Sequence, residues 1–204
     1  MPIDVKAKTL QKQLAEQLPS LEVIVYGRSS DFHKAIKKQD GDAFLAFRVA
    51  LEKGKVPVTV SIQGLIKGEG VEPYYLIGTS APDLTESSKM ATRDLLGRRA
   101  MPKFVNQALG FTKVKVKVAN KTEDLLTLLQ LNQVDLLLVR KSSIEKVQAK
   151  SNQKLETKKL SSMVFGLPAV GILNKEVEKA VVDAFLGMST EAKKGLGVET
   201  WKKL

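Results

Sequence analysis

The stretch FTKVKVKVANKTEDLLTLLQLNQVDLLLVRKSS, residues 111–143, carries the clearest secondary-structure signals of the chain. Lysine and valine alternate over residues 113–119, which predicts a strand with one apolar face. Leucines cover more than half of the helical circumference over residues 121–132, which predicts a helix buried against a sheet. Residues 134–139 are apolar on both faces, as a central parallel strand requires. The stretch therefore predicts a strand–helix–strand unit of a parallel sheet.

The alternating lysines could follow a phosphate backbone or decorate the edge of a sheet. The chain carries a formal charge of +11, but only 5% of its residues are aromatic, and its richest basic segment, residues 140–159, contains none. Proteins that bind single-stranded nucleic acid usually stack bases on aromatic side chains, whereas lysines protect a sheet edge from aggregation. We therefore predict an edge strand, a solvated basic helix within residues 140–159 and no nucleic-acid partner. A basic nucleic-acid-binding protein is the less favoured alternative.

Strand and helix patterns also alternate elsewhere. Leucines at helical spacing predict a first helix over residues 4–19. Up to residue 80 the chain then alternates strands and helices, with strands at 21–27, 41–47, 56–65 and 71–80 and helices at 28–39 and 48–54. A second run begins near residue 82, with a strand at 98–101, a helix with Pro102 in its first turn and Gly110 as its C-cap, and two closing helices after residue 174. Two such runs predict an α/β protein in which each part has a doubly wound, mostly parallel sheet with flanking helices.

Several classes of site are excluded by composition. The chain has no cysteine and one histidine, His33, so a thiolate or multi-histidine metal site cannot form. No apolar run approaches the roughly 20 residues that cross a bilayer. No motif for a nucleotide, a metal or covalent catalysis is present, and we interpret His33 as a surface or packed residue and Asp135 as a turn or cap residue. We expect no cofactor, no metal and no enzymatic activity.

Four phrases resemble a known family. Residues 29–47, SSDFHKAIKKQDGDAFLAF, are similar to the helix-then-strand unit of type 2 periplasmic binding proteins. DLLGRRAMPKFVNQALG (94–110) resembles the segment that opens the family's second lobe, where a leucine-glycine-basic turn leads into a strand, and residues 116–139 resemble its strand, helix and aspartate-headed strand. VVDAFLGMSTEAKKGLGVETW (181–201) is similar to the closing helix of the phosphate- and phosphonate-type branch.

The chain departs from this family in two places. It opens almost directly into the first helix, and RRAM (98–101) runs straight into Pro102 where the phosphonate branch has a serine-rich loop. The second departure puts binding of a free phosphonate in doubt.

The resemblance implies a two-lobed periplasmic-binding-protein-like fold, with lobe I formed by residues 1–78 plus 175–204 and lobe II by residues 79–174. It implies a monomeric solute-binding protein that captures a small ligand, with an anion favoured, in an interlobe cleft by hinge closure. Its partner would be the permease of an ABC-type transporter or a sensor. The resemblance also implies a periplasmic or exported protein whose signal peptide has been removed. A ligand-sensing or enzymatic domain on the same fold stays open as an alternative, because fold does not fix function.

We expect six residues to bind the ligand, because strand ends and helix N-termini are where open α/β sheets bind ligands. They are Tyr26, Arg28 and Ser29 from lobe I, Thr79 and Ser80 from the crossover, and Arg98 from lobe II. Plainer interpretations stay open: Ser29 would cap a helix, Thr79 and Ser80 would form a turn, and Arg98 would be a surface residue. We expect Trp201 to anchor the last helix in the first lobe.

Overall fold

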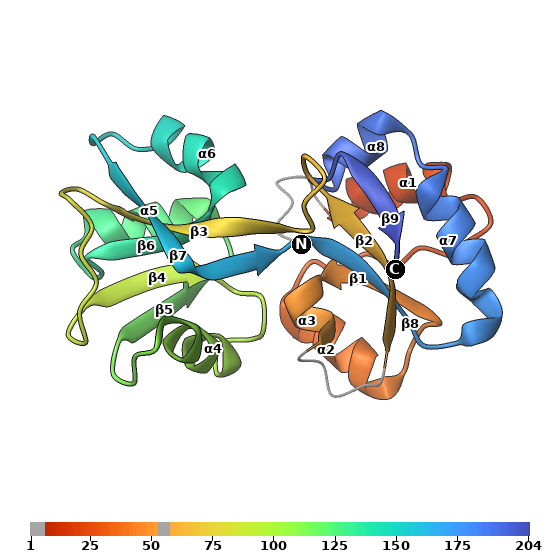
Figure 1. Ribbon diagram of the computed structural model, residues 1–204, viewed down its shortest axis with the longest axis horizontal. Helices are drawn as coiled ribbons and strands as arrows, with labels where there is room; N and C mark the ends of the chain where they lie inside the picture. The colour runs from red at the N-terminus through yellow and green to blue at the C-terminus, as the bar shows by residue number, and fades with distance from the viewer. Residues whose placement is uncertain (1–6, 53–57) are drawn as a thin grey trace. The chain divides into compact units, whose positions relative to one another are not determined.

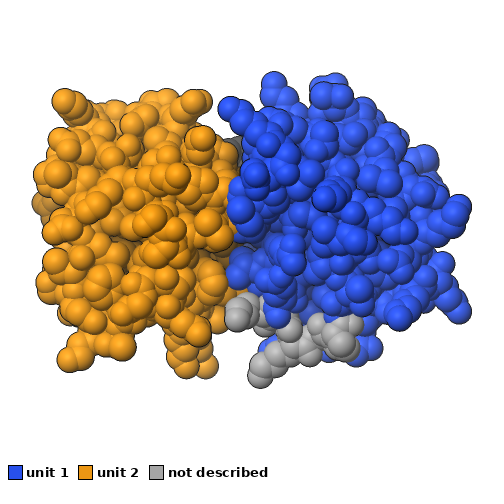
Figure 2. Space-filling view, viewed as in Figure 1, with its two compact units in different colours: residues 1, 3–71, 166–204 blue, residues 2, 72–165 orange. Residues whose placement is uncertain are grey.

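The computed structural model describes residues 7–52 and 58–204. The chain forms two compact units, coloured separately in Figure 2. Unit 1 contains the described residues before 72 and those from 166 to 204, and unit 2 contains residues 72–165. The predicted two-lobed α/β fold is confirmed. The chain passes between the units after Val71 and after Phe165, whereas we expected the boundaries after residues 78 and 174.

Unit 1 is built on a four-stranded sheet of order β1-β8-β2-β9 (Figure 1). Its strands are β1 (Ala43–Phe47), β2 (Thr59–Leu65), β8 (Pro168–Ile172) and β9 (Thr200–Lys203). Neighbouring strands all run antiparallel, so the predicted mostly parallel sheet is wrong for this unit. The physical reason is that β8, which returns from unit 2, lies between β1 and β2. These two strands run in the same direction but do not touch, and the sequence gives no sign of which strand separates them.

Helices bury the apolar residues of this sheet. They are α1 (Ala7–Gln17), α2 (Ser29–Lys38), α3 (Arg48–Glu52), α7 (Glu178–Leu186) and α8 (Thr190–Gly195), with a 3-10 turn η2 (Lys175–Val177) before α7. Leu10, Leu14 and Leu18 belong to a hydrophobic core cluster of this unit, as the predicted first helix requires. We expected Trp201 to anchor the last helix, but it lies in β9, a strand that we did not predict. Its ring packs edge-on against Phe185 of α7, with the ring centroids 5.2 Å apart.

The predicted strand at residues 21–27 is wrong. These residues form no β-ladder, and residues 21 and 27 are bends. Val23 and Val25 pack against the core, while Ile24 is 57% exposed. The N–H of Val25 donates a hydrogen bond to the Gln11 side chain, at 3.1 Å, and not to a neighbouring strand. The apolar alternation was therefore real, but it reports packing on the core and not membership of a sheet.

Unit 2 contains a five-stranded mixed sheet of order β5-β4-β6-β3-β7. Its strands are β3 (Val71–Gly78), β4 (Lys89–Arg93), β5 (Lys115–Ala119), β6 (Leu136–Arg140) and β7 (Glu156–Gly166). β5 lies at the edge and β6 at the centre, as the sequence predicts. β4, β5 and β6 are parallel, whereas β3 runs antiparallel to β6.

The predicted strand at residues 98–101 is also wrong. The strand is β4, which begins nine residues earlier, and in it Met90, Ala91 and Thr92 are buried in succession. Residues 98 and 99 form a turn, and α4 begins at Ala100. The segment DLLGRR (94–99) therefore follows a strand and leads into a helix. Its resemblance to the family's turn, which leads into a strand, does not hold.

The helices of unit 2 follow the prediction more closely. They are α4 (Ala100–Leu109), α5 (Thr122–Gln130), a 3-10 turn η1 (Lys141–Ser143) and α6 (Ile144–Ala149). Gly110 ends α4 with a left-handed φ of 72°, as a C-cap glycine does. Leu125, Leu126 and Leu129 are buried against the sheet, although Leu131 is exposed. The basic segment 140–159 is helical in η1 and α6 alone and joins β7 at Glu156.

Candidate functional site

Charged residues gather at one end of the unit 2 sheet. Because β4, β5 and β6 are parallel, their carboxyl ends lie together, and the first residues of antiparallel β3 lie at that same end. Arg93 ends β4, Arg140 ends β6, and Glu72 is the second residue of β3. Ligands of open α/β sheets bind outside the carboxyl ends of strands. We call Glu72, Arg93, Thr122, Arg140, Ser142 and Ser143 the strand-end cluster.

The positive charge of Arg140 has several partners within this cluster. Its Nη1 lies 3.6 Å from the Glu72 carboxylate, and its Nε donates to the Ser143 hydroxyl at 3.2 Å. Its guanidinium also lies over the Phe165 ring, 5.5 Å from the centroid, where a cation–π contact forms. Burial lowers the pKa of Arg140, while Glu72 and Tyr74 oppose that change. The side chain is thus a largely buried cation with partners on several sides.

Glu72 joins β3 to the turn after β6. Its carboxylate accepts the Ser142 N–H at 2.8 Å and the Ser142 hydroxyl at 3.0 Å, besides the Arg140 ion pair. Only 7% of the side chain is exposed. A buried carboxylate with three donors is held in a fixed position, so Glu72 keeps its carboxylate beside Arg140.

The positive charge of Arg93 has fewer partners in the cluster than that of Arg140. It leaves the sheet on the face opposite to Arg140, where its Nη1 donates to the Thr122 hydroxyl, at 3.2 Å, in the first turn of α5. Burial and then the charge of Arg140 lower the pKa of Arg93 to about 10, against the opposing charges of Glu123 and Asp124. Over the described residues, no carboxylate oxygen lies within 4.0 Å of its nitrogens. A guanidinium has five N–H donors, so Arg93 keeps donors for an anion and stays charged at neutral pH.

The loop after β4 completes this end of the sheet. Asp94 accepts the Gly97 N–H at 2.6 Å, and the Gly97 carbonyl accepts the N–H groups of Ala100 and Met101. Gly97 has a φ of 89°, which favours glycine. The loop therefore satisfies the first turn of α4 internally and leaves Arg98 exposed beside the carboxyl end of β4.

Of the predicted residues in unit 2, only Arg98 lies at this end. Thr79 and Ser80 are exposed and directly follow β3. Because β3 is antiparallel to β6, its last residues lie at the opposite end of the sheet, near the start of β6. The structure therefore does not bring Thr79 and Ser80 together with Arg98.

The other predicted residues lie in unit 1. Arg28 precedes α2 with an extended backbone and makes no side-chain cap. The Ser29 carbonyl lies 2.6 Å from Nδ1 of His33, and Tyr26 packs edge-on against Phe32 at 6.1 Å. Because residues 21–27 are not a strand, the strand-end argument for these residues no longer applies, and their role in binding stays a prediction.

Sequence reasoning missed Arg93, Arg140 and Glu72. A signal was present for the two arginines: each directly follows a run of buried residues, MAT (90–92) and LLLV (136–139). A charged residue at the carboxyl end of a predicted parallel strand is a candidate ligand contact. Glu72 gave no such signal, because its position depends on the antiparallel direction of β3.

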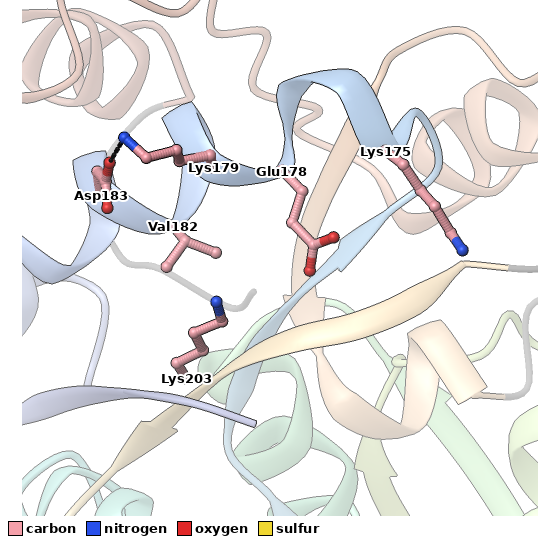
Figure 3. A pocket seen from close by; sticks show the side chains of 6 residues that line it. All are labelled: Lys175, Glu178, Lys179, Val182, Asp183 and Lys203. Carbon is pink, nitrogen blue, oxygen red and sulfur yellow. Dashed lines mark hydrogen bonds and ion pairs between the residues drawn. The ribbon is translucent and has the colours of Figure 1, made fainter.

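A surface hollow of about 390 Å³ lies in unit 1, beside α7 and β9, and is lined by Lys175, Glu178, Lys179, Val182, Asp183 and Lys203 (Figure 3). Figure 3 shows Glu178 and Lys203 reaching into it from the two elements. Lys179 pairs with Asp183 at 3.3 Å, and Glu178 accepts the Ser61 hydroxyl at 2.7 Å. Its charges are of both signs and partly paired, so it favours an anion less than the strand-end cluster does.

Two features are absent from the part of the chain that the structure describes. Among residues 7–52 and 58–204, no three His, Asp or Glu side chains are grouped so that they could hold a metal ion. Over the same residues, no helix is long and apolar enough to span a membrane.

Comparison with known proteins shows similarity of fold without similarity of sequence. No protein-family model matches the chain, and no curated protein matches it in sequence. Among solved structures, the GluR0 ligand-binding core in complex with L-glutamate is similar with a TM-score of 0.61 and 15% identity, over 94% of this chain and 87% of that one. XAC2383 from Xanthomonas citri bound to ATP has a TM-score of 0.66 and 8% identity, over 97% and 86%.

The substrate-binding protein of an amino acid ABC transporter is also similar, with a TM-score of 0.56 and 13% identity over 92% of this chain and 80% of that one. At these identities the likeness concerns the fold alone. The chain has the two-lobed α/β fold of type 2 periplasmic-binding-protein-like structures.

Proposed function

We propose that the protein is a solute-binding protein that binds a small anionic ligand at the strand-end cluster of unit 2. The observation that carries this proposal is Arg93, a half-buried cation at the carboxyl end of β4 whose guanidinium donates one hydrogen bond within the described chain, to Thr122. A buried guanidinium with unfilled donors favours a carboxylate, sulfonate or phosphate partner.

Ligands of two proteins with this fold agree with an anion, although the similar ArgBP from T. maritima is bound to arginine, whose side chain is a cation. GluR0 is in complex with L-glutamate, and XAC2383 has been observed with ATP and with chloride. These molecules all carry negative charge, although they differ widely in size. They support the class of ligand and not its identity.

The fold also supports a role in transport or sensing. Similar structures include the substrate-binding protein of an amino acid ABC transporter and a domain of BvgS from Bordetella pertussis. We propose that this chain is exported and delivers its ligand to a transporter permease or a sensor, without catalysing a reaction. A monomeric state, the absence of nucleic-acid binding and the phosphate- and phosphonate-type branch stay predictions.

The proposal is tested by a thermal-shift screen of small carboxylates, sulfonates and phosphates, followed by calorimetric titration of the anions that stabilise the protein. An anion that binds only the folded state raises the melting temperature, because it stabilises that state by RT ln(1 + c/Kd), where c is the free anion concentration. We expect Arg93→Gln to weaken binding about ten- to a hundredfold, because a charge-assisted hydrogen bond contributes about 1.5–3 kcal/mol.

The matched control is Arg99→Gln, which removes the same charge from an exposed position at the same end of the sheet. Its affinity should stay within about threefold of wild type, since exposed charges are screened. Equal affinity in wild type and Arg93→Gln would remove Arg93 from the site. The same titration of Arg28→Ala tests whether Arg28 contributes.

A further inference from the structure

One edge of the unit 2 sheet has no neighbouring strand. β5 is the last strand in the order β5-β4-β6-β3-β7, so it is bonded on one side, to β4 (Figure 1). The Lys115 N–H donates to the Ser88 carbonyl at 3.1 Å, and the Ala119 carbonyl accepts the Asp94 N–H at 2.9 Å. Because alternate residues of a strand bond to the same neighbour, the odd-numbered residues of β5 bond to β4. The even-numbered residues therefore direct their N–H and C=O groups away from the sheet.

These even-numbered residues have different surroundings along the edge. At Val114, just before β5, the Asn106 side chain accepts the N–H at 3.1 Å and donates to the carbonyl at 3.0 Å, in the manner of a neighbouring strand. At Val116 and Val118, no group among the described residues outside the sheet makes such hydrogen bonds. Their outward N–H and C=O groups are therefore available to an added strand.

The two faces of β5 differ in chemistry. Lys115 and Lys117 are exposed on one face, and Val116 and Val118 are half-buried on the other. Lys115 lies directly beside Lys89 of β4 in the register of the sheet, and like charges at paired positions repel each other. Over the described residues, no carboxylate oxygen lies within 4.0 Å of the ammonium groups of these three lysines.

The carboxylates around β5 bind backbone groups or lie beyond its carboxyl end. Asp135 accepts the Lys89 N–H at 3.1 Å, and Glu86 accepts two backbone N–H groups just before β5. The acidic residues that follow β5, Glu123 and Asp124, lie in the first turn of α5. α4, which packs against β5, has no acidic residue. The lysine face of β5 therefore lacks partners of opposite charge.

We propose that the edge of β5 binds an extended segment of a partner protein in which acidic and apolar residues alternate. This segment adds a strand to the sheet, with its carboxylates beside Lys115 and Lys117 and its apolar residues beside Val116 and Val118. Residues on one face of a strand repeat every 6.8 Å or about that, so the acidic residues match the spacing of the lysines. Lys117 now donates to the neutral Gln133 side chain at 2.8 Å, and a carboxylate is the stronger acceptor.

The same lysines disfavour a second copy of this chain at the edge. Two β5 strands joined antiparallel in one sheet would place the lysines of both copies on the same face, where like charges repel. Lysines on edge strands prevent self-pairing in this way. An acidic strand converts the repulsion into attraction.

The experiment uses the full chain and fluorescently labelled peptides, whose binding is followed by anisotropy at physiological ionic strength. The probe alternates glutamate and valine over six residues between glycine ends. Its matched control has the same residues as a block of glutamates followed by a block of valines, so composition and charge are equal. We expect the alternating probe to bind about tenfold more tightly, because only this peptide presents carboxylates on one face at the spacing of the lysines.

The role of charge is tested with Lys115→Gln and Lys117→Gln in one protein. This change should weaken binding of the alternating probe about tenfold, since each exposed ion pair contributes modestly. The matched control combines Lys37→Gln and Lys38→Gln, which removes two exposed lysines from the last turn of α2 in unit 1. Its affinity should stay within about twofold of wild type, because salt screens distant charges.

The role of the backbone is tested without changing the protein. One version of the alternating probe is N-methylated at its valines and another at its glutamates, so each lacks one set of alternate N–H donors. Only one set faces β5 in an added strand, so one version should bind about tenfold more weakly than the other. Loss with the methylated valines indicates antiparallel addition, because directly paired residues then share a face and exchange both hydrogen bonds; loss with the methylated glutamates indicates parallel addition.

Each contrary outcome overturns the inference. Equal affinity of the two methylated probes would exclude an added strand, and equal affinity of the alternating and block probes would exclude recognition of the pattern. Tighter binding of a single-stranded oligonucleotide, lost when Lys115 and Lys117 are replaced, would assign the edge to nucleic acid. Self-association of the protein that the probe reverses would assign it to a second copy. The proposed function at the strand-end cluster would stand in every case.

Discussion

At the scale of the residue, Gln63 joins the segments that enter and leave unit 2. This buried side chain of β2 lies with its amide nitrogen 3.0–3.4 Å from the carbonyl oxygens of Gly64, Gly70, Leu167 and Pro168. Gly70 and Leu167 flank the two points at which the chain changes units, and the Leu167 N–H donates to Gly70 at 3.0 Å. The Leu167 carbonyl also accepts the Arg48 N–H, at 3.2 Å, so backbone and side-chain donors together hold these converging segments. An amide nitrogen has two N–H donors, which Gln63 shares among the four carbonyl groups.

Gly64, the next residue of β2, leaves no room for a side chain. A Cβ at this position would lie 2.4 Å from Val198 Cγ1 and 2.8 Å from the Pro168 carbonyl oxygen. We predict that Gly64→Ala lowers the free energy of unfolding by about 2–4 kcal/mol, because the strand must shift to relieve the overlap. Denaturant unfolding followed by the fluorescence of Trp201, the one tryptophan of the sequence, measures this change in unit 1.

Gly195→Ala is the matched control for that prediction. No atom lies within 4 Å of a Cβ built at Gly195, the last residue of α8. The substitution should leave the unfolding free energy unchanged or raise it by up to about 1 kcal/mol, since alanine favours a helix more than glycine does. Equal destabilisation by both substitutions would refute the packing argument for Gly64.

At the scale of the element, helices could be predicted better than strand pairing. Leu10, Leu14 and Leu18 identified α1, and Gly110 identified the end of α4, because these signals lie within one turn of helix. The position of β8 between β1 and β2 could not be predicted, because that pairing joins segments more than a hundred residues apart. The direction of β3 could not be predicted for the same reason, and it is this direction that puts Thr79 and Ser80 at the end of the sheet opposite to Arg98. Their role in binding stays a prediction.

The start of α8 offers a test of a local signal. The Ser189 hydroxyl accepts the Ala192 N–H at 3.2 Å, with an extended backbone at the cap position. We predict that Ser189→Ala lowers the unfolding free energy by about 1 kcal/mol, because an N-cap serine satisfies a helix N–H that is otherwise without a partner. Thr190→Ala removes a neighbouring exposed hydroxyl inside the helix and should change stability by less than about 0.5 kcal/mol in the same denaturant titration. If the two variants were equally destabilised, the cap would have no special role.

At the scale of the whole molecule, two strands, β3 and β7, carry the chain between its two compact units. Unit 2 has sixteen basic and nine acidic residues, and unit 1 has seventeen and thirteen, so the unit with the strand-end cluster also has the larger positive excess. A positive field raises the local concentration of small anions and speeds their arrival. The composition predicted this positive charge. The order of the strands, however, is needed to place Arg93 and Arg140 at the same end of the unit 2 sheet.

The most direct test of the account is to observe the arginine side chains while an anion binds. The sequence contains six arginines, so arginine-selective ¹⁵N labelling gives a small set of Nε–H signals that can be assigned by substitution. Methanesulfonate is titrated into the protein at constant ionic strength. We expect the Nε–H signal of Arg93 to shift saturably and further than that of any other arginine. The Arg140 signal should shift less. A saturable shift at Arg28 or Arg48 in unit 1, with Arg93 unchanged, would contradict this account.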